Sequence, residues 1–193
     1  KKERFFMGLN YDDIFYEDYY NNRWDTSDPL TTISWSTVDD SLHIPSEGAE
    51  IQVAVSPEPF MSTFRSAFNL WDSALESLSF SETNLGNDAD VTLAITEFDG
   101  PGNTGGYWNS STSGGVINES SIRFDVADIY TQDLLTLALH EIGNVLGLGD
   151  IRPNGEFRSV QQDPFPETFS GDSLWPDDVK LIRSYYGELD NAG

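Results

Sequence analysis

The chain has 193 residues, of which 33 are Asp or Glu and 10 are Lys or Arg, so its formal net charge at pH 7 is -23. A surface with this charge repels nucleic acids and anionic membranes on average, and it favours metal cations, cationic partners or a saline medium. The chain has no cysteine and two histidines, which excludes disulfides, thiolate zinc sites, cysteine nucleophiles and any site built from three histidines. No apolar run approaches the ~18 residues of a membrane span.

The first 30 residues differ from the rest of the chain. Residues 11–28 mix aromatic, acidic and Asn side chains without a helical or a two-residue period. We therefore predict an acidic, aromatic N-terminal extension over residues 1–30, which is either a solvated arm or a segment that wraps the domain or binds a partner. Regular patterns begin at Thr31, so we predict a globular domain over residues 31–187 and a short C-terminal tail over residues 188–193.

The pattern of the globular part changes from strands to helices along the chain. Alternating or β-branched segments predict strands at residues 32–36, 51–55, 90–96 and 121–125. After the helix start at Ser56–Pro59, apolar residues recur at helical spacing: Phe60, Phe64, Phe68, Trp71 and Leu75. Two later helices are predicted at about residues 131–147 and 176–186. Strands that alternate with one helix and then give way to two helices indicate an α/β or α+β domain with one sheet.

The second long helix carries the segment LLTLALHEIGNVLGLGD. His140 and Asn144 are four residues apart, so they lie on one helix face, one turn apart. Gly147 permits a positive φ where the chain leaves the helix, which lets Asp150 fold back toward the same point. Two donors on a helix, a third after a glycine turn and Glu141 beside the first form the pattern of a three-ligand metal centre with a water-activating base. The local alternative is an ordinary buried histidine, with Asn144 hydrogen-bonded across a cleft.

At these residues the chain resembles the metzincin metallopeptidases, whose motif is His-Glu-x-x-His-x-x-Gly-x-x-His or Asp, followed by a methionine turn. The resemblance continues through FNLWDSALESLSF, DVTLAIT, FDGPG, GGVINESSIRFD and LWPDDVKLIRSYYG, which follow the order of the matrixin and serralysin branches and cover about residues 31–187. It implies a twisted mixed sheet with an active-site helix and a C-terminal helix, and a protein or peptide substrate that lies antiparallel to an edge strand.

The resemblance implies that His140 and Asp150 are zinc ligands and that Glu141 is the general base. Asn144 stands where the family has a second histidine. If ~10–16 kcal/mol of zinc affinity is shared among four ligands, losing one costs about 3–4 kcal/mol, a factor on the order of 10²–10³ in affinity. The methionine turn is also not recognisable, because Ser159–Gln162 (SVQQ) occupies its region. The other histidine, His43, is expected to be an ordinary loop residue.

Further acidic residues match other features of the same family. Asp99, Asp125 and Asp128 resemble the matrixin structural calcium site, and the alternative is an acidic turn in an acidic protein. Arg123 falls near the place of a histidine of the matrixin structural zinc site, so we expect that zinc site to be absent. Asp177 and Asp178 are expected to begin the final helix as favourable N-terminal charges.

Two functional hypotheses remain open from the sequence. The first is a zinc endopeptidase with an impaired metal centre. The second is a catalytically silent pseudopeptidase that binds peptides, or its own N-terminal arm, in the cleft. The acidic surface favours a saline or calcium-containing extracellular medium, so we expect a secreted protein with Zn²⁺ and Ca²⁺ as cofactors.

Overall fold

The computed structural model describes residues 5–6, 9–10, 22–28, 30–38, 54–97, 99–102, 104–130, 133–151, 158–162 and 173–187. Several predictions lie outside these residues, namely those for His43, for residues 51–53 of the second strand, for most of the N-terminal extension and for the tail at 188–193. Within the described part of the chain, no helix combines the length and the apolar character that crossing a membrane requires.

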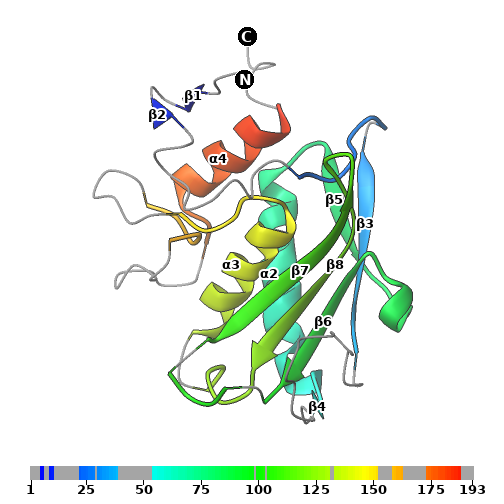
Figure 1. The fold of residues 1–193 in the computed structure, drawn as a ribbon, viewed down its shortest axis with the longest axis vertical. Coiled ribbons are helices and arrows are strands. Elements are labelled where there is room, and N and C mark those ends of the chain that lie inside the picture. Colours follow the sequence, from blue (N-terminus) through cyan, green and yellow to red (C-terminus); the bar gives the residue numbers. More distant parts are fainter. Residues whose placement is uncertain are drawn as a thin grey trace.

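The centre of the molecule is one mixed sheet (Figure 1). Its five main strands lie in the order β5 (Leu78–Glu82), β3 (Thr31–Thr37), β6 (Val91–Thr96), β8 (Val116–Asp125) and β7 (Gly106–Ser113). All neighbours in this order are parallel except β7, which is antiparallel to β8 and forms an edge. The short β4 (Ala54–Val55) pairs with β6, and β1 (Phe5–Phe6) pairs with β2 (Leu9–Asn10) as a separate ribbon. A mixed sheet with helices confirms the predicted α+β class.

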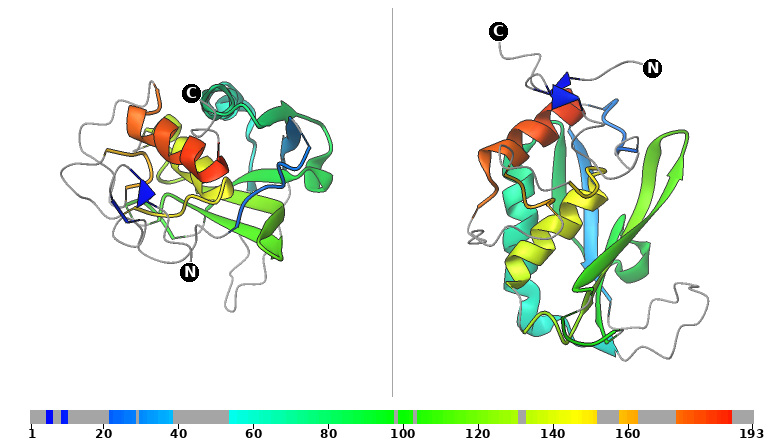
Figure 2. Two further views of the ribbon diagram at one scale, coloured as in Figure 1. Left: turned by 90° about the horizontal axis from the view of Figure 1, so that it is seen from above. Right: turned by 60° about the vertical axis from the view of Figure 1, so that its left-hand side comes forward.

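Three α-helices and two 3-10 turns complete the described fold. They are η2 (Glu58–Phe60), α2 (Met61–Ala74), η3 (Gly86–Asp88), α3 (Leu134–Val145) and α4 (Pro176–Tyr186). Figures 1 and 2 show α2 and α3 side by side on one face of the sheet, with α4 near one end of that pair. The helix predicted over residues 176–186 is confirmed at both ends.

The core lies between this helix pair and the sheet. The predicted stripe of α2 supplies Phe64, Phe68 and Trp71, each at most 1% exposed. The Phe68 ring stacks on Trp35 of β3 with ring centroids 4.4 Å apart. The indole of Trp71 donates to the Leu139 carbonyl at 3.0 Å, which fixes α2 against α3. The prediction that this stripe is a core face is therefore confirmed.

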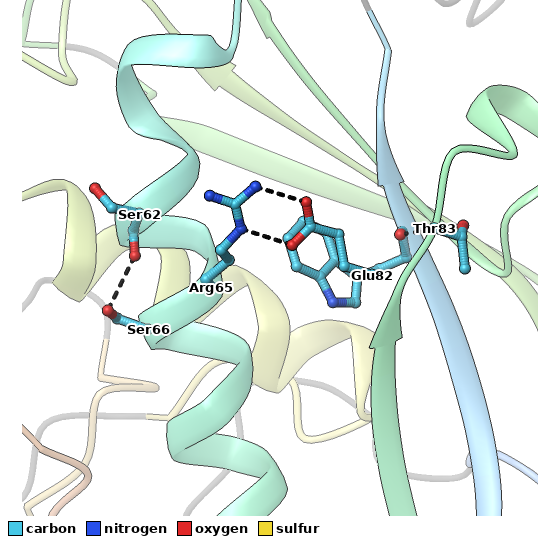
Figure 3. Close-up of polar contacts among 6 residues, drawn as sticks. Ser62, Arg65, Ser66, Glu82 and Thr83 are labelled. Atoms are coloured by element: carbon cyan, nitrogen blue, oxygen red, sulfur yellow. Dashed lines mark hydrogen bonds and ion pairs between the residues drawn. The ribbon is translucent and has the colours of Figure 1, made fainter.

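An exposed ion pair joins α2 to the far edge of the sheet (Figure 3). The guanidinium of Arg65 donates to both carboxylate oxygens of Glu82 on β5, at 2.6 and 2.8 Å. A bidentate arrangement fixes the orientation of both side chains. Because both are exposed, solvent screens the attraction, and the pair positions β5 more than it stabilises it.

The structure corrects several predicted boundaries. Helix α3 begins at Leu134, later than predicted, because the Asp133 carboxylate caps it by accepting from the Leu135 amide at 3.0 Å. Helix α2 ends at Ala74, so the buried Leu75 belongs to the core in an extended conformation. Strand β8 begins at Val116 instead of residue 121, and β5 and β7 were not predicted.

Residues 22–24, which the prediction assigned to the extension, pack on the domain, and we call them the N-terminal strap. The Arg23 amide donates to the Gly115 carbonyl at 3.1 Å, and the Arg23 carbonyl accepts from the Ile117 amide at 3.0 Å. Trp24 is 5% exposed and its indole donates to the Val145 carbonyl at the end of α3. The strap therefore ties the β7–β8 hairpin to the end of the helix that carries the candidate metal ligands.

Candidate metal centre

Helix α3 buries the first candidate ligand and orients its ring. His140 is 7% exposed, and its Nδ1 lies 2.9 Å from the Val160 carbonyl oxygen. Because a carbonyl only accepts, Nδ1 carries the proton, and Nε2 faces the opposite way. Nε2 lies 3.1 Å from Oδ1 of Asp150. The ring is therefore held in the orientation that presents Nε2 together with the Asp150 carboxylate.

Asn144 lies one turn farther along α3 and reaches the same carboxylate. Its Nδ2 lies 3.3 Å from Oδ1 of Asp150, and its Oδ1 is buried without a hydrogen-bond partner among the described residues. The two ends of an amide are assigned from their hydrogen bonds, and rotating the amide by half a turn exchanges them. Two donors about 2.0–2.1 Å from one tetrahedral zinc ion lie roughly 3.3 Å apart. The His140 and Asn144 side chains thus each lie about as far from Oδ1 of Asp150 as two ligands of one zinc ion lie from each other.

The turn after α3 brings Asp150 to this point, as the sequence predicts. Gly147 has φ +89°, a backbone conformation that favours glycine. A Cβ at Gly147 would lie 2.0 Å from the Asn22 carbonyl oxygen of the strap. The strap and the turn therefore fit together only because residue 147 has no side chain.

His140 and Asp150 favour opposite charges in each other. Burial opposes the charged form of His140, but the hydrogen bond to Asp150, the nearby Glu141 and Asp150 charges and the Val160 carbonyl outweigh it and raise its pKa to about 9. Burial likewise opposes ionisation of Asp150, yet His140 and Asn144 together hold its pKa below the usual range. At neutral pH the two side chains form an imidazolium and a carboxylate. A metal ion that binds here displaces the proton from Nε2.

Glu141 lies between α3 and the edge strand. It is 3% exposed, and a Cβ at Gly106 of β7 would lie 2.9 Å from its Oε1. The missing side chain at the start of β7 therefore makes room for this carboxylate. Glu141 is thus placed beside the strand along which the resemblance implies a substrate.

Residues 159–162, at the expected position of a methionine turn, contact both the ring and the backbone of His140. The Gln161 side chain is buried, and its Nε2 donates to the His140 carbonyl at 2.8 Å. Asp178 of α4 anchors this segment by accepting from the Ser159 hydroxyl and from the Val160 amide at 3.1 Å. Burial raises the pKa of Asp178 to about 7.

Asp178 therefore has two roles. It also accepts from the Trp175 amide, so it caps α4 as expected of an N-terminal acid. Its second role, in holding Ser159 and Val160, was not predicted from the sequence. A buried aspartate leaves no sequence signal for a partner that lies 18 or 19 residues earlier in the chain.

A cavity of about 390 Å³ opens beside the candidate ligands. Asn144, Gly147, Gly149 and Asp150 form one wall. Residues of the β7–β8 hairpin and Asn22 of the strap form the rest: Trp108, Asn109, Ser110, Thr112 and Ile117. Except for Asp150 the lining is uncharged. Asn22 and Trp108 were not predicted as site residues, because only the tertiary fold brings them to this cavity.

The candidate calcium residues also come together. One carboxylate oxygen from each of Asp99, Asp125 and Asp128 lies within 4.8 Å of the others. Asp125 and Asp128 are fully buried, whereas Asp99 is exposed. Backbone amides of the Asp99–Gly102 turn donate to the two buried carboxylates at 2.7–3.2 Å. The turn is therefore folded around the acidic group.

Arg123 of β8 is 3% exposed and takes part in a partly buried polar contact. Its guanidinium donates to the Tyr107 hydroxyl on β7 at 3.2 Å and lies 6.0 Å from the centre of that ring. The guanidinium of Arg123 thus lies near the position at which the resemblance implies a histidine of the structural zinc site.

Comparisons with known proteins identify the family to which the chain is similar. A family model of the matrixins, peptidase family M10, matches residues 35–187. Metalloendoproteinase 1 of Glycine max is 27% identical over 158 residues, which cover 72% of this chain and 50% of the relative. Matrix metalloproteinase-19 of Homo sapiens is 29% identical over 147 residues, which cover 68% of this chain and 27% of the relative. The chain thus spans half or less of the length of these relatives.

Among solved structures, a chain of the GM1-bound form of the ECX AB5 holotoxin aligns with 92% of this chain and 81% of its own length. Its TM-score is 0.43 at 16% identity, and no functional inference follows at that level. The family model covers most of the chain, and its match includes the helix with the candidate ligands. The chain belongs to the matrixin family of peptidases.

Proposed function

We propose that this domain is a zinc-dependent endopeptidase whose metal centre is weakened by Asn144. The observation that carries the proposal is the convergence of His140 Nε2 and the Asn144 amide on one carboxylate oxygen of Asp150, at 3.1 and 3.3 Å. The donor set fits a zinc ion, with one imidazole, one carboxylate and one amide oxygen after rotation of the amide. A neutral amide is the weakest of these ligands.

The protein side chains divide the chemistry between them. Zinc, when bound, supplies the Lewis acidity that makes water a nucleophile at neutral pH. Glu141 is the group that accepts the proton of the attacking water, because its carboxylate lies next to the first ligand and against Gly106 of β7. The outer edge of β7, which pairs with no further strand among the described residues, binds the peptide backbone as an additional strand and holds the scissile bond over α3.

The test is cleavage of an unfolded protein substrate at saturating zinc. We expect cleavage that a chelator stops, that zinc restores and that Glu141→Gln abolishes. Glu119→Gln, an exposed glutamate on β8, is the matched control and keeps wild-type activity. Cleavage that survives in Glu141→Gln or in excess chelator would contradict the proposal.

The second candidate is a pseudopeptidase that binds a peptide, or its own N-terminal arm, without cleaving it. Two features favour it: the amide at position 144 in place of an imidazole, and the strap that carries Asn22 into the cavity wall. Labelled peptides then bind the metal-free protein, and removal of residues 1–21 strengthens their binding. If the wild type is purified with stoichiometric zinc, this candidate loses its main support.

We further propose that Asp99, Asp125 and Asp128 hold a structural calcium ion. Calcium takes oxygen ligands at about 2.3–2.6 Å, so two ligands on opposite sides of one ion are at most roughly 5 Å apart, which agrees with the separation of the three carboxylates. A calcium-containing, saline extracellular medium suits both this site and the charge of -23. Calcium titration followed by thermal unfolding tests the site.

A further inference from the structure

The candidate metal centre offers one nitrogen donor, and its other donors are oxygens. His140 Nε2 lies 3.1 Å from Oδ1 of Asp150, and the Asn144 amide lies 3.3 Å from the same oxygen. Zinc centres in proteins are built mostly from imidazole nitrogen and thiolate sulfur, and the catalytic ones commonly have two or three such ligands. Carboxylate and carbonyl oxygens instead suit Mg²⁺, Ca²⁺ and Mn²⁺. The donor set of this chain is therefore richer in oxygen than the set that zinc prefers.

The amide oxygen of Asn144 is buried and available to an ion. The side chain is 2% exposed, and its Oδ1 has no hydrogen-bond partner among the described residues. A buried acceptor without a partner destabilises a fold. Rotation of the amide by half a turn places this oxygen where Nδ2 now lies, 3.3 Å from Oδ1 of Asp150. Two oxygens at that separation repel each other unless they share a cation, so a bound ion gives the amide oxygen its partner.

The cavity beside these ligands has room for further ligands. Its volume is about 390 Å³, and Asn144 and Asp150 form part of its wall. Asn109 and Ser110 add hydrogen-bonding groups to its lining. Zinc in proteins is usually four-coordinate, whereas an octahedral set rich in oxygen is typical of Mg²⁺ and Mn²⁺. Because imidazole is a ligand of transition-metal ions, Mn²⁺ fits the whole donor set better than Mg²⁺ or Ca²⁺ does.

We propose that the centre formed by His140, Asn144 and Asp150 also binds Mn²⁺, and that Asn144 is the residue that lowers its selectivity for zinc over Mn²⁺. The inference rests on the proposed metal centre, but it does not depend on peptide cleavage. An imidazole at position 144 favours zinc much more than Mn²⁺, whereas an amide oxygen favours neither strongly.

The test measures the metal-free wild type and Asn144→His with each ion alone at one pH. Competition against a fluorescent chelator gives the dissociation constant for zinc, and the EPR signal of free Mn²⁺ gives that for manganese. We expect Asn144→His to lower the zinc constant by on the order of 10²–10³. The same change should lower the Mn²⁺ constant by less than about tenfold. Equal gains for the two ions would overturn the proposal.

A second readout places the bound Mn²⁺, because the carboxylates of Asp99, Asp125 and Asp128 are also candidate ligands for this ion. Pulsed EPR detects the coupling of Mn²⁺ to an imidazole nitrogen, which a cluster of carboxylates does not supply. The coupling should be present in the wild type and absent in His140→Ala. Its absence in the wild type would overturn the proposal.

Asn144→Asp tests the contact at position 144 without adding a nitrogen. It keeps the size and an oxygen donor and adds a charge, so Mn²⁺ should bind at least about tenfold more tightly. Asn109→His, in the lining of the same cavity, should change neither constant by more than about threefold. No gain in Mn²⁺ affinity in Asn144→Asp would show that residue 144 does not contact the ion. Cleavage assays decide the proposed function separately, since the two dissociation constants are measured without a substrate.

Discussion

Asn144→His should strengthen the proposed zinc centre. The side chain at 144 is 2% exposed, points at the carboxylate that His140 also contacts, and adjoins a cavity of about 390 Å³ that can take the larger ring. Zinc in structural sites is bound with ~10–16 kcal/mol, so one of four ligands is worth about 3–4 kcal/mol. Replacing a neutral amide by an imidazole should therefore lower the zinc dissociation constant by on the order of 10²–10³.

The assay is competition against a fluorescent zinc chelator at one fixed pH. The pH is fixed because zinc displaces the His140 proton in the wild type and in the variant alike. Asn109→His is the control, since Asn109 is exposed and lines the same cavity without contacting Asp150 through any hydrogen bond that the structure shows. An affinity gain below about threefold in Asn144→His, or an equal gain in Asn109→His, would refute the ligand assignment of position 144.

Three further predictions concern stability. The pKa of Asp178 is raised to about 7, so its proton stabilises the fold at low pH and this contribution is lost as the pH rises through 7. Relative to Asp178→Asn, the free energy of unfolding of the wild type in urea should fall by up to about 1.4 kcal/mol per pH unit between pH 5 and 7. If the free energies of unfolding of the two proteins changed in parallel with pH, the burial argument would be contradicted. Calcium at 100 times its dissociation constant should stabilise the domain by about 2.7 kcal/mol; Asp125→Asn should remove this effect and the exposed Asp88→Asn should keep it. Gly147→Ala should destabilise more than the control Gly114→Ala, because both have a positive φ but only the first places a Cβ against the strap. The left-handed backbone costs roughly 1–3 kcal/mol in both, so equal losses by thermal unfolding would show that the strap yields freely.

The elements that could be predicted are those whose apolar residues follow a regular pattern within the element itself. The α2 stripe with Phe64, Phe68 and Trp71 and the fully buried β6 have patterns that one element produces by itself. Strand β7 (GYWNSSTS) is a polar edge strand, mostly exposed along its second half, so it shows no apolar alternation. Its strand character comes from pairing with β8, which no pattern within β7 records.

In the candidate site, too, some residues could be predicted from local spacing and others could not. His140, Glu141, Asn144 and Asp150 follow from helical spacing and from the glycine turn at 147, so the sequence suffices to find them. The residues that hold these side chains in place do not lie at helical spacing from them. Gln161 and Asp178 reach the site across 18 to 21 residues of chain, and Trp24 across 121. Such partners are set by tertiary packing.

The most direct test of the account is a crystal structure of the wild-type protein grown with zinc, with diffraction measured on both sides of the zinc absorption edge. We predict one anomalous peak about 2.0–2.2 Å from His140 Nε2 and from an Asp150 carboxylate oxygen, with the Asn144 amide oxygen turned toward it. No peak at this position at millimolar zinc, with His140 and Asp150 still paired at 3.1 Å, would contradict the proposed metal centre.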